Sequence, residues 1–368
     1  MSGTGPVGVG VIGAGTISNQ YLENLTAFPD VEVLIVGDIF TEKAAEQAAK
    51  FGVAAWGTPE QVLAHAGVEI IINLTIPAAH AEVSLAALES GRHVWSEKPF
   101  ALDRASGLEL LSTAEKAGLR IGGAPDTMLG AGIQSALRMI ARGDIGTPLT
   151  GLTLFELPGP VDDHRNLEVL LSVGAGPLWD IGPYYLTALS QVFGSFSRVV
   201  ASGRTARPTR TLQVGPKAGQ QITAQVPTHV GILADFDEGG MSTSVLSWDS
   251  PHRRVGHVEV VGTEATLSIP DPNKFDGELR IRSKDDEEWR VVQATGSTAG
   301  RGVGALDIAR SVRADVPHRI TGDLAYHVLD TMAAVSESIE TGAHVAVESS
   351  APRLAPLDEG WNPYERTL

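Results

Sequence analysis

The fold of this 368-residue chain is decided by the stretch Val7-Gly-Val-Gly-Val-Ile-Gly13-Ala-Gly15-Thr-Ile-Ser18. Its apolar first half, Val7–Ile12, runs into two closely spaced glycines, Gly13 and Gly15. The apolar spacing of a helix follows over residues 18–28 and is closed by a proline. Strand, glycine turn and helix in this order predict the first unit of a parallel α/β domain.

The glycine turn also has the form of a dinucleotide fingerprint. Gly13 permits the tight turn, Gly15 lets the backbone approach a pyrophosphate, and Ser18 is small enough for the third glycine position. The helix that opens at Thr16 and Ile17 would offer its free N–H groups to the phosphates. These four positions (13, 15, 16 and 17) are predicted cofactor contacts, and the alternative is a plain turn without a ligand.

The next apolar run ends in an acidic residue. Val31–Gly37 reads as a second strand, and Asp38 follows it directly. A carboxylate there accepts hydrogen bonds from the adenosine ribose and repels a 2′-phosphate, which favours NAD over NADP. The alternative is that Asp38 caps the helix expected from Thr41 onward.

Helices and apolar strands continue to alternate through the first third of the chain. Strands are expected at 54–56, 69–75, 93–96 and 119–123, and helices at 41–51, 59–66, 78–90 and 105–117. This alternation predicts a doubly wound parallel sheet, in which ligands bind beyond the carboxyl ends of the strands. Thr75, Glu97-Lys98 and Asp126 all follow strands, so we expect them along the same edge as Gly13.

The second half of the chain predicts a different sheet. Strands are expected at 150–156, 228–237, 241–249, 257–262, 265–269, 279–283 and 289–293, with helices at 183–193, 303–314 and 323–341. We therefore expect two domains, residues 1–125 and 126–368. The loop Pro158–Val173 contains His164, which is either a substrate contact or a solvated side chain.

Composition excludes several classes of protein. The net charge is −16 without a basic stripe, which argues against a nucleic-acid partner. The absence of cysteine excludes disulfides and thiolate metal sites, and no His, Asp and Glu set has metal spacing. No basic leader and no run of 18 apolar residues occurs, so we expect a cytoplasmic protein without a membrane contact.

The motifs together resemble one family. Gly10-Val-Ile-Gly13-Ala-Gly15, Asp38, Thr75-Ile-Pro-Ala-Ala-His80 and Gly91-Arg-His-Val-Trp-Ser-Glu97-Lys98-Pro99 are similar to the motifs of the Gfo/Idh/MocA oxidoreductases. The resemblance implies a Rossmann domain followed by an α/β domain with a large, open, mostly antiparallel sheet. It also implies bound NAD, a small-molecule carbohydrate substrate, and a homo-oligomer (dimer or tetramer) that uses the large sheet.

The resemblance further implies roles for individual residues. Thr75, His80, Glu97 and Lys98 would contact the cofactor, with Lys98 near the nicotinamide and the reacting hydroxyl. Asp180-Ile-Gly-Pro-Tyr184 matches the family motif Asp-x-Gly-x-His/Tyr, whose two ends project at the substrate. Asp126 and Tyr185 are further predicted substrate contacts. From the residues alone, the alternative is an Asp helix cap followed by aromatic core positions.

Three functions remain open on the sequence. The first is an NAD-dependent oxidoreductase acting on a secondary hydroxyl of a sugar, cyclitol or glycoside, with Lys98, Asp180 and Tyr184 as catalytic residues. Tyr184 would exchange the proton, because a nearby cation such as Lys98 can make a phenol a usable base. The second is an NAD-dependent glycosidase that oxidises C3 transiently, and the third is a non-catalytic sugar or NAD sensor.

Overall fold

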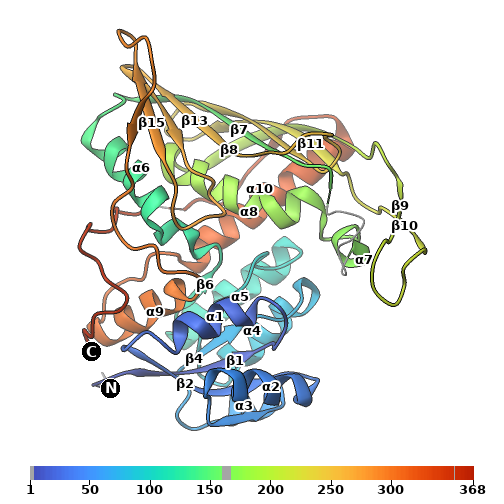
Figure 1. The fold of residues 1–368 in the computed structure, drawn as a ribbon, viewed down its shortest axis with the longest axis vertical. Coiled ribbons are helices and arrows are strands. Elements are labelled where there is room, and N and C mark those ends of the chain that lie inside the picture. The colour runs from blue at the N-terminus through green and yellow to red at the C-terminus, as the bar shows by residue number, and fades with distance from the viewer. Residues whose placement is uncertain (1–3, 160–166, 352) are drawn as a thin grey trace. The chain divides into compact units, whose positions relative to one another are not determined.

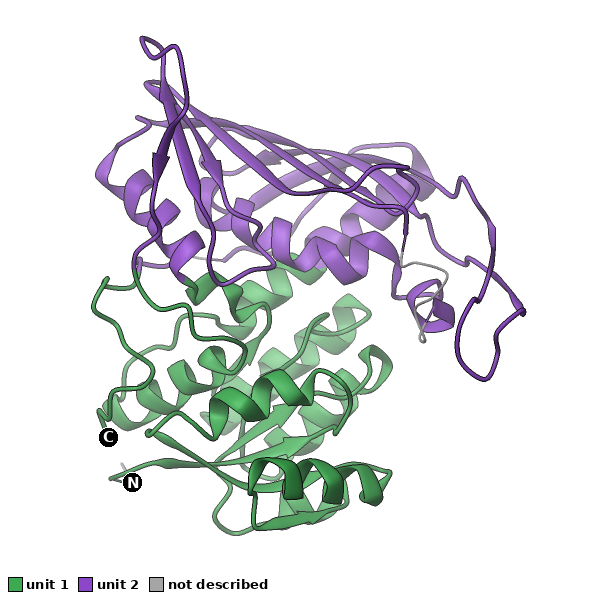
Figure 2. Cartoon of the chain, in the orientation of Figure 1, with its two compact units in different colours: residues 1–130, 296–329, 357–368 green, residues 131–295, 330–356 purple. Residues whose placement is uncertain are grey.

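The computed structural model describes residues 4–159, 167–351 and 353–368 (Figure 1). The chain forms two compact units, which Figure 2 distinguishes by colour. The first unit comprises residues 1–130, 296–329 and 357–368, and the second comprises residues 131–295 and 330–356. We describe each unit by itself.

The first unit is built on a six-stranded parallel sheet with the order β3-β2-β1-β4-β5-β6. Its strands are β1 (Val7–Ile12), β2 (Val31–Gly37), β3 (Ala55–Gly57), β4 (Ile70–Asn73), β5 (His93–Ser96) and β6 (Ile121–Gly123). Most of these strands are buried along their length, as expected for a sheet covered on both faces. The doubly wound Rossmann architecture predicted from the alternation is confirmed.

Helices connect these strands on both faces of the sheet. They are α1 (Ser18–Leu25), α2 (Thr41–Phe51), α3 (Pro59–Ala64), α4 (His80–Glu89) and α5 (Arg104–Ala117), with 3₁₀ turns η1 (Pro77–Ala79) and η2 (Asp126–Leu129). Right-handed crossovers from a central β1 put α1 and α2 on one face and α4 and α5 on the other. In agreement, α1 packs on α2, and α4 packs on α5.

The carboxyl ends of the central strands are in register. Ile12 at the end of β1 pairs with Gly37 of β2 and with Asn73 of β4. Asn73 pairs with Ser96 of β5, which in turn pairs with Gly123 of β6. The residues that follow these strands therefore emerge along one edge of the sheet, where the sequence predicted the ligand site.

The predicted division at residues 125 and 126 differs from the compact units. Residues 296–329 were expected in the second domain, yet they belong to the unit of the parallel sheet. The physical reason is the packing of α9 (Val303–Ala314), which covers β4, β5 and β6. Gly304 lies so close to the buried ring of Trp95 on β5 that any Cβ there would overlap the indole.

The second unit is built on a nine-stranded sheet with the order β16-β15-β14-β13-β7-β12-β11-β8-β17. Seven of its strands are β7 (Pro148–Glu156), β8 (Phe196–Arg204), β11 (His229–Phe236), β12 (Met241–Ser247), β13 (Arg254–Gly262), β14 (Ala265–Ile269) and β15 (Leu279–Ser283), and the edges are β16 (Arg290–Val292) and β17 (Val345–Ala346). All neighbours pair antiparallel except β12 with β7. The large, mostly antiparallel sheet implied by the resemblance is confirmed.

Helices cover one face of this sheet (Figure 1). They are α6 (Ala131–Arg142), α8 (Gly176–Phe193) and, from residue 330 onward, α10 (Gly322–Thr341), while α7 (Leu167–Leu170) is a single turn. The start of α8 corrects the predicted helix 183–193. Pro177 lies in its first turn, where a proline is compatible with a helix, so the helix begins before Asp180.

The other face of the sheet exposes a row of side chains. Leu152, Thr243 and Leu233 are opposite one another on β7, β12 and β11, and both leucines are exposed. The oligomer expected from the resemblance would cover this face and stays a prediction. Among the described helices, none is both long and apolar enough to cross a membrane.

Replacement of Gly304 by alanine tests the packing of α9 on the parallel sheet. Although alanine favours a helix, the added methyl group must overlap Trp95, so we expect a loss of about 1–3 kcal/mol in the free energy of unfolding. Urea denaturation measures this loss. Gly360→Ala, where nothing lies within 4 Å of the added Cβ, is the control. An unchanged midpoint for Gly304→Ala would contradict the close packing.

Candidate functional site

The glycine loop after β1 is shaped for a close approach of backbone to ligand. Gly13 has φ of 109°, and a Cβ there would lie 2.5 Å from the carbonyl oxygen of Leu74, so only glycine fits. At Gly15, by contrast, nothing lies within 4 Å of a built Cβ, and the residue is exposed. The loop is thus packed on the sheet at Gly13 and open to a ligand at Gly15.

The N-terminus of α1 follows this loop. Within the described residues no side chain caps it, since Ile17 makes no side-chain hydrogen bond there. Ser18, in the third glycine position, is buried and donates its hydroxyl to the carbonyl oxygen of Gly15 at 2.6 Å. Thr16 is exposed. An uncapped helix N-terminus beside an open glycine is the arrangement that binds a pyrophosphate.

Asp38 lies beside the glycine loop at the end of β2. Its Oδ2 accepts a hydrogen bond from the Ala14 N–H at 2.7 Å, and its Oδ1 accepts one from the Phe40 N–H at 2.9 Å. The side chain is half-buried, and each carboxylate oxygen keeps further lone pairs. The carboxylate therefore fits a ribose diol, while it also supports the turn into α2.

Thr75 lies just beyond β4 and is held by Asn73. Its N–H and its hydroxyl both donate to Oδ1 of Asn73, at 3.2 and 2.6 Å. The buried amide of Asn73 donates in turn to the carbonyl oxygen of His80 and to the hydroxyl of Ser84. Asn73 thus fixes the loop that carries Thr75, which is itself half-buried.

His80 is buried and contacts the backbone of two neighbouring segments. Its side chain is 1% exposed, with Nδ1 at 2.8 Å from the Pro99 carbonyl oxygen and Nε2 at 3.0 Å from the Thr75 carbonyl oxygen. Burial lowers the pKa of the imidazole, and the two carbonyl contacts oppose that shift. His80 therefore holds residues 75 and 99 in place, and its cofactor contact stays a prediction.

Glu97 and Lys98 directly follow β5 and differ in exposure. Glu97 is buried, accepting the Tyr21 hydroxyl at Oε1 (2.8 Å) and the Lys98 N–H at Oε2 (3.1 Å). Both oxygens are thus engaged inside the protein, and the cofactor contact of Glu97 stays a prediction. Lys98 is half-exposed, and the Lys98–Pro99 peptide bond is cis.

Asp126, predicted to contact substrate, is fully buried in the first unit. Its Oδ2 accepts the N–H groups of Gly302 and Gly304 at 2.7 and 3.4 Å, which stabilises the N-terminus of α9. Burial raises the pKa of this carboxyl to about 6, and Arg301, with its guanidinium 3.8 Å away, opposes the rise. Asp126 thus anchors α9 and is buried in this structure, and its substrate contact stays a prediction.

The second unit carries the remaining predicted residues. Asp180 and Tyr184 lie one turn apart on α8, with Asp180 half-exposed and Tyr184 buried. Tyr185 is fully buried, and its hydroxyl accepts the Gly256 N–H at 2.9 Å, while its substrate contact stays a prediction. His164 lies outside the described residues.

The candidate site residues therefore form two groups, one in each compact unit. Gly13, Gly15, Thr16, Ile17, Asp38, Thr75 and Lys98 share the carboxyl edge of the parallel sheet, and Asp180 and Tyr184 share a helix of the second unit. Sequence reasoning missed Tyr21, Asn73 and Arg301, which support the edge from inside. Only Asn73 left a signal, as a polar residue that closes the otherwise apolar run Ile70–Asn73.

Both halves of the chain match family models. Residues 7–123 match the model described as oxidoreductase family, NAD-binding Rossmann fold, and residues 133–268 match the model of the Gfo/Idh/MocA C-terminal domain. Inositol 2-dehydrogenase 3 of Saccharopolyspora erythraea is 31% identical over 77% of this chain and 80% of its own length. The chain belongs to the Gfo/Idh/MocA oxidoreductase family.

A second curated relative and a solved structure are also similar to this chain. The scyllo-inositol 2-dehydrogenase (NAD⁺) of Bacillus subtilis is 24% identical over 70% of this chain and 72% of its own length. A solved structure of levoglucosan dehydrogenase with NADH and L-sorbose has a TM-score of 0.83 at 21% identity, covering 93% of this chain and 99% of that one. The last comparison shows the shared fold, and the family model shows that the first unit is an NAD-binding Rossmann domain.

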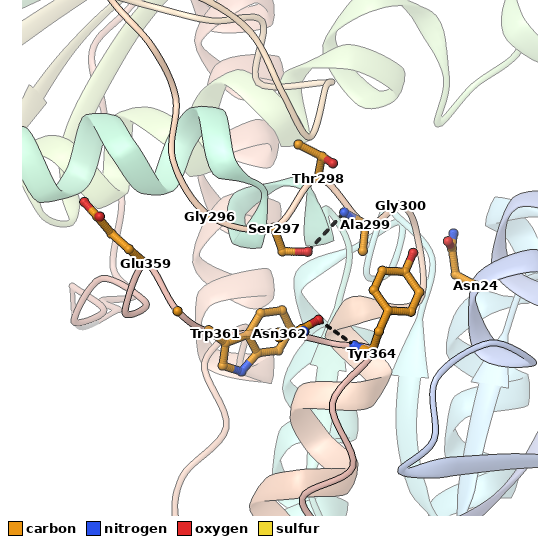
Figure 3. Close-up of a pocket in the computed structure, with 11 residues that line it drawn as sticks. Asn24, Gly296, Ser297, Thr298, Ala299, Gly300, Glu359, Trp361, Asn362 and Tyr364 are labelled. Carbon is orange, nitrogen blue, oxygen red and sulfur yellow. Dashed lines mark hydrogen bonds between the residues drawn. The ribbon is translucent and has the colours of Figure 1, made fainter.

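A separate pocket of the first unit lies between the linker 296–300 and the segment 359–364 (Figure 3). Its volume is about 550 Å³, and Trp361 and Tyr364 contribute aromatic rings to its lining. Among the described residues, none of those predicted for the Gfo/Idh/MocA site lines this pocket. Within the same described ranges, no group of three or more His, Asp or Glu side chains is arranged to hold a metal ion.

Replacement of Asp38 tests the cofactor edge. In Asp38→Ala the ribose hydroxyls would lose their acceptor and the Ala14 N–H its partner, so we expect NAD affinity to fall by about 10- to 100-fold. Because the carboxylate also repels a 2′-phosphate, the ratio of NADP to NAD affinity should rise. Isothermal titration calorimetry with both cofactors measures this, with Glu115→Ala on exposed α5 surface as control. Unchanged affinities would exclude Asp38 from the cofactor site.

Proposed function

We propose that this protein is an NAD-dependent dehydrogenase that oxidises a secondary hydroxyl of a sugar, cyclitol or glycoside. The observation that carries the proposal is the in-register edge at which Gly15, Asp38 and Lys98 follow β1, β2 and β5 of one parallel sheet. The names of two relatives, inositol 2-dehydrogenase and scyllo-inositol 2-dehydrogenase (NAD⁺), support the class of substrate. A levoglucosan dehydrogenase of the same fold agrees with it.

Each part of the edge has a task in such a reaction. Bound NAD would supply the acceptor for the hydride that leaves the carbinol carbon. The N-terminus of α1 and the open Gly15 would hold the pyrophosphate, and Asp38 would bind the ribose diol. These residues of the first unit would hold the pyrophosphate and the adenosine ribose of the cofactor.

Lys98 is proposed to stabilise the oxygen of the reacting hydroxyl. Its backbone is held on one side by Glu97 and, through the carbonyl oxygen of Pro99, by His80 on the other. A half-exposed ammonium group on a fixed backbone suits the negative charge that develops as the hydroxyl loses its proton. The held backbone means that little reorganisation is required of the lysine during the reaction.

Tyr184 is the proposed proton acceptor and Asp180 its companion on α8. A phenol with an ordinary pKa of about 10 accepts a proton at neutral pH only when a cation stabilises its anion, and Lys98 would be that cation. Asp180 precedes Tyr184 by one helical turn, so its carboxylate and the phenol project from the same side of α8. We propose that Asp180 accepts a hydrogen bond from a second hydroxyl of the substrate and orients it.

A substrate panel with two readouts tests the function. We expect free sugars, cyclitols and nitrophenyl glycosides to give NADH, followed by absorbance, without release of the nitrophenol. Release of nitrophenol without NADH, with solvent deuterium entering at C2, would instead identify the redox-neutral glycosidase. Tight NAD binding without turnover of any compound in the panel would indicate the non-catalytic sensor. Either of the last two results overturns the dehydrogenase proposal.

Replacement of Lys98 tests the catalytic assignment. Lys98→Ala removes the charge that stabilises the developing alkoxide, so we expect kcat to fall by about 10²- to 10³-fold. The Kd for NAD should change little, because the phosphates and the ribose diol are held by other residues. Stopped-flow and steady-state kinetics measure both, and Lys116→Ala, an exposed lysine on α5, is the control. A near-normal rate would rule out the assignment.

A further inference from the structure

A chain of buried hydrogen bonds runs from Trp95 through Tyr21 and Glu97 to the backbone N–H of Lys98. The Trp95 indole N–H donates to the hydroxyl oxygen of Tyr21 at 3.1 Å, and the Tyr21 hydroxyl donates to Oε1 of Glu97 at 2.8 Å. The second carboxylate oxygen, Oε2, accepts the backbone N–H of Lys98 at 3.1 Å. Trp95 and Tyr21 are fully buried and Glu97 is 6% exposed, so the chain is closed to solvent.

The direction of each hydrogen in this chain is fixed by chemistry. An indole nitrogen can only donate and a carboxylate can only accept, so the hydroxyl hydrogen of Tyr21 must point to Glu97. Burial, followed by the charge of Glu97, raises the pKa of the Tyr21 phenol well above its usual value, which keeps that hydrogen in place. Tyr21 is therefore a permanent donor to the Glu97 carboxylate.

Glu97 depends on that donor. A carboxylate taken out of water is costly unless hydrogen bonds replace the lost solvent. Tyr21 supplies the bond at Oε1, which leaves Oε2 directed at the Lys98 N–H. Without the phenol hydroxyl, Oε1 would lose the donor that now fixes the orientation of the carboxylate, and the hydrogen bond that Oε2 accepts from the Lys98 N–H would be less well fixed.

The chain also joins two elements that serve the cofactor. Tyr21 lies on α1, three residues after Ser18 and therefore one turn from the glycine loop, whereas Glu97 and Lys98 directly follow β5. Through Glu97, the Tyr21 side chain thus links α1, which we propose binds the cofactor phosphates, to the backbone of Lys98. His80 holds the following residue, Pro99, from α4 on the opposite face.

We infer that Tyr21 is a positioning residue for Lys98, acting through Glu97, and this inference rests on the proposed dehydrogenase function. Its hydroxyl fixes the carboxylate that in turn fixes the Lys98 backbone, so the ammonium group is aligned when the hydride leaves. Tyr21 itself is fully buried, so we infer that it acts without direct contact with cofactor or substrate. Its contribution should therefore appear in the chemical step and not in cofactor binding.

Tyr21→Phe, which removes one buried oxygen atom, tests this inference. We expect kcat to fall by about 10- to 100-fold, the size of a lost charge-assisted hydrogen bond, with near wild-type affinity for NAD. The deuterium isotope effect on kcat, measured with substrate labelled at the carbinol carbon, should rise because hydride transfer becomes slower than product release. Tyr364→Phe, at an exposed tyrosine of the same unit, is the control and should leave all three values unchanged.

A double-mutant cycle separates positioning from general loss of structure. Glu97→Gln keeps the shape of the side chain and leaves one carbonyl oxygen, so it should also lower kcat. Because Tyr21 acts through Glu97, adding Tyr21→Phe to Glu97→Gln should lower kcat little further. Multiplicative losses in the double variant, or an unchanged isotope effect in Tyr21→Phe, would overturn the inference.

Hydrogen exchange gives a readout that needs no substrate. Peptide-resolved exchange should show the Lys98 amide exchanging about 10-fold faster or more in Tyr21→Phe, with β1 and β4 unchanged. Unchanged exchange at Lys98 would overturn the inference even if the protein is an active dehydrogenase. If the wild-type protein turns over no substrate while Lys98 exchange rises in the variant, the proposed function fails and the structural link stands.

Discussion

Parallel pairing of β1 with β2 and β4 is the constraint on which the rest of the first unit depends. Parallel strands end at one edge, and the register of Ile12, Gly37 and Asn73 brings the following loops side by side. Backbone pairing alone therefore collects a glycine turn, an acidic residue and a lysine from segments far apart in the chain. Because strand ends cannot slide without breaking the ladder, the edge is a rigid frame for a cofactor.

Two buried carboxylates then attach helices to this frame. Glu97 accepts its hydrogen bond from Tyr21 on α1, and Asp126 accepts two from the start of α9. An acid without partners would be expelled from such a site, so each carboxylate requires its helix, and each helix gains a fixed end. Glu97 and Asp126, which the sequence predicted as ligand contacts, therefore also hold α1 and α9 on the parallel sheet.

Much of this could be predicted from the sequence, and the physical reason for the rest is distance along the chain. Gly13, Asp38 and Lys98 could be placed at the carboxyl edge because each follows an apolar strand that is visible in the local pattern. Tyr21 was read as an apolar helix position, since its partner Glu97 lies 76 residues further on. Likewise, an amphipathic pattern identifies α9 but does not say which sheet it covers, and the glycines before Asp180 concealed the start of α8.

Exposure separates the residues of the carboxyl edge that a ligand can reach from those that it cannot reach. Gly15, Thr16 and Lys98 reach solvent, Asp38 does so in part, and the acids behind them do not. The ligand-facing surface of the first unit is thus made largely of backbone, one carboxylate and one ammonium group. Backbone and carboxylate suit a dinucleotide and recognise no particular sugar. Under the proposed function, other residues would have to recognise the substrate, whereas the lysine and its buried support would set the chemistry that all substrates share.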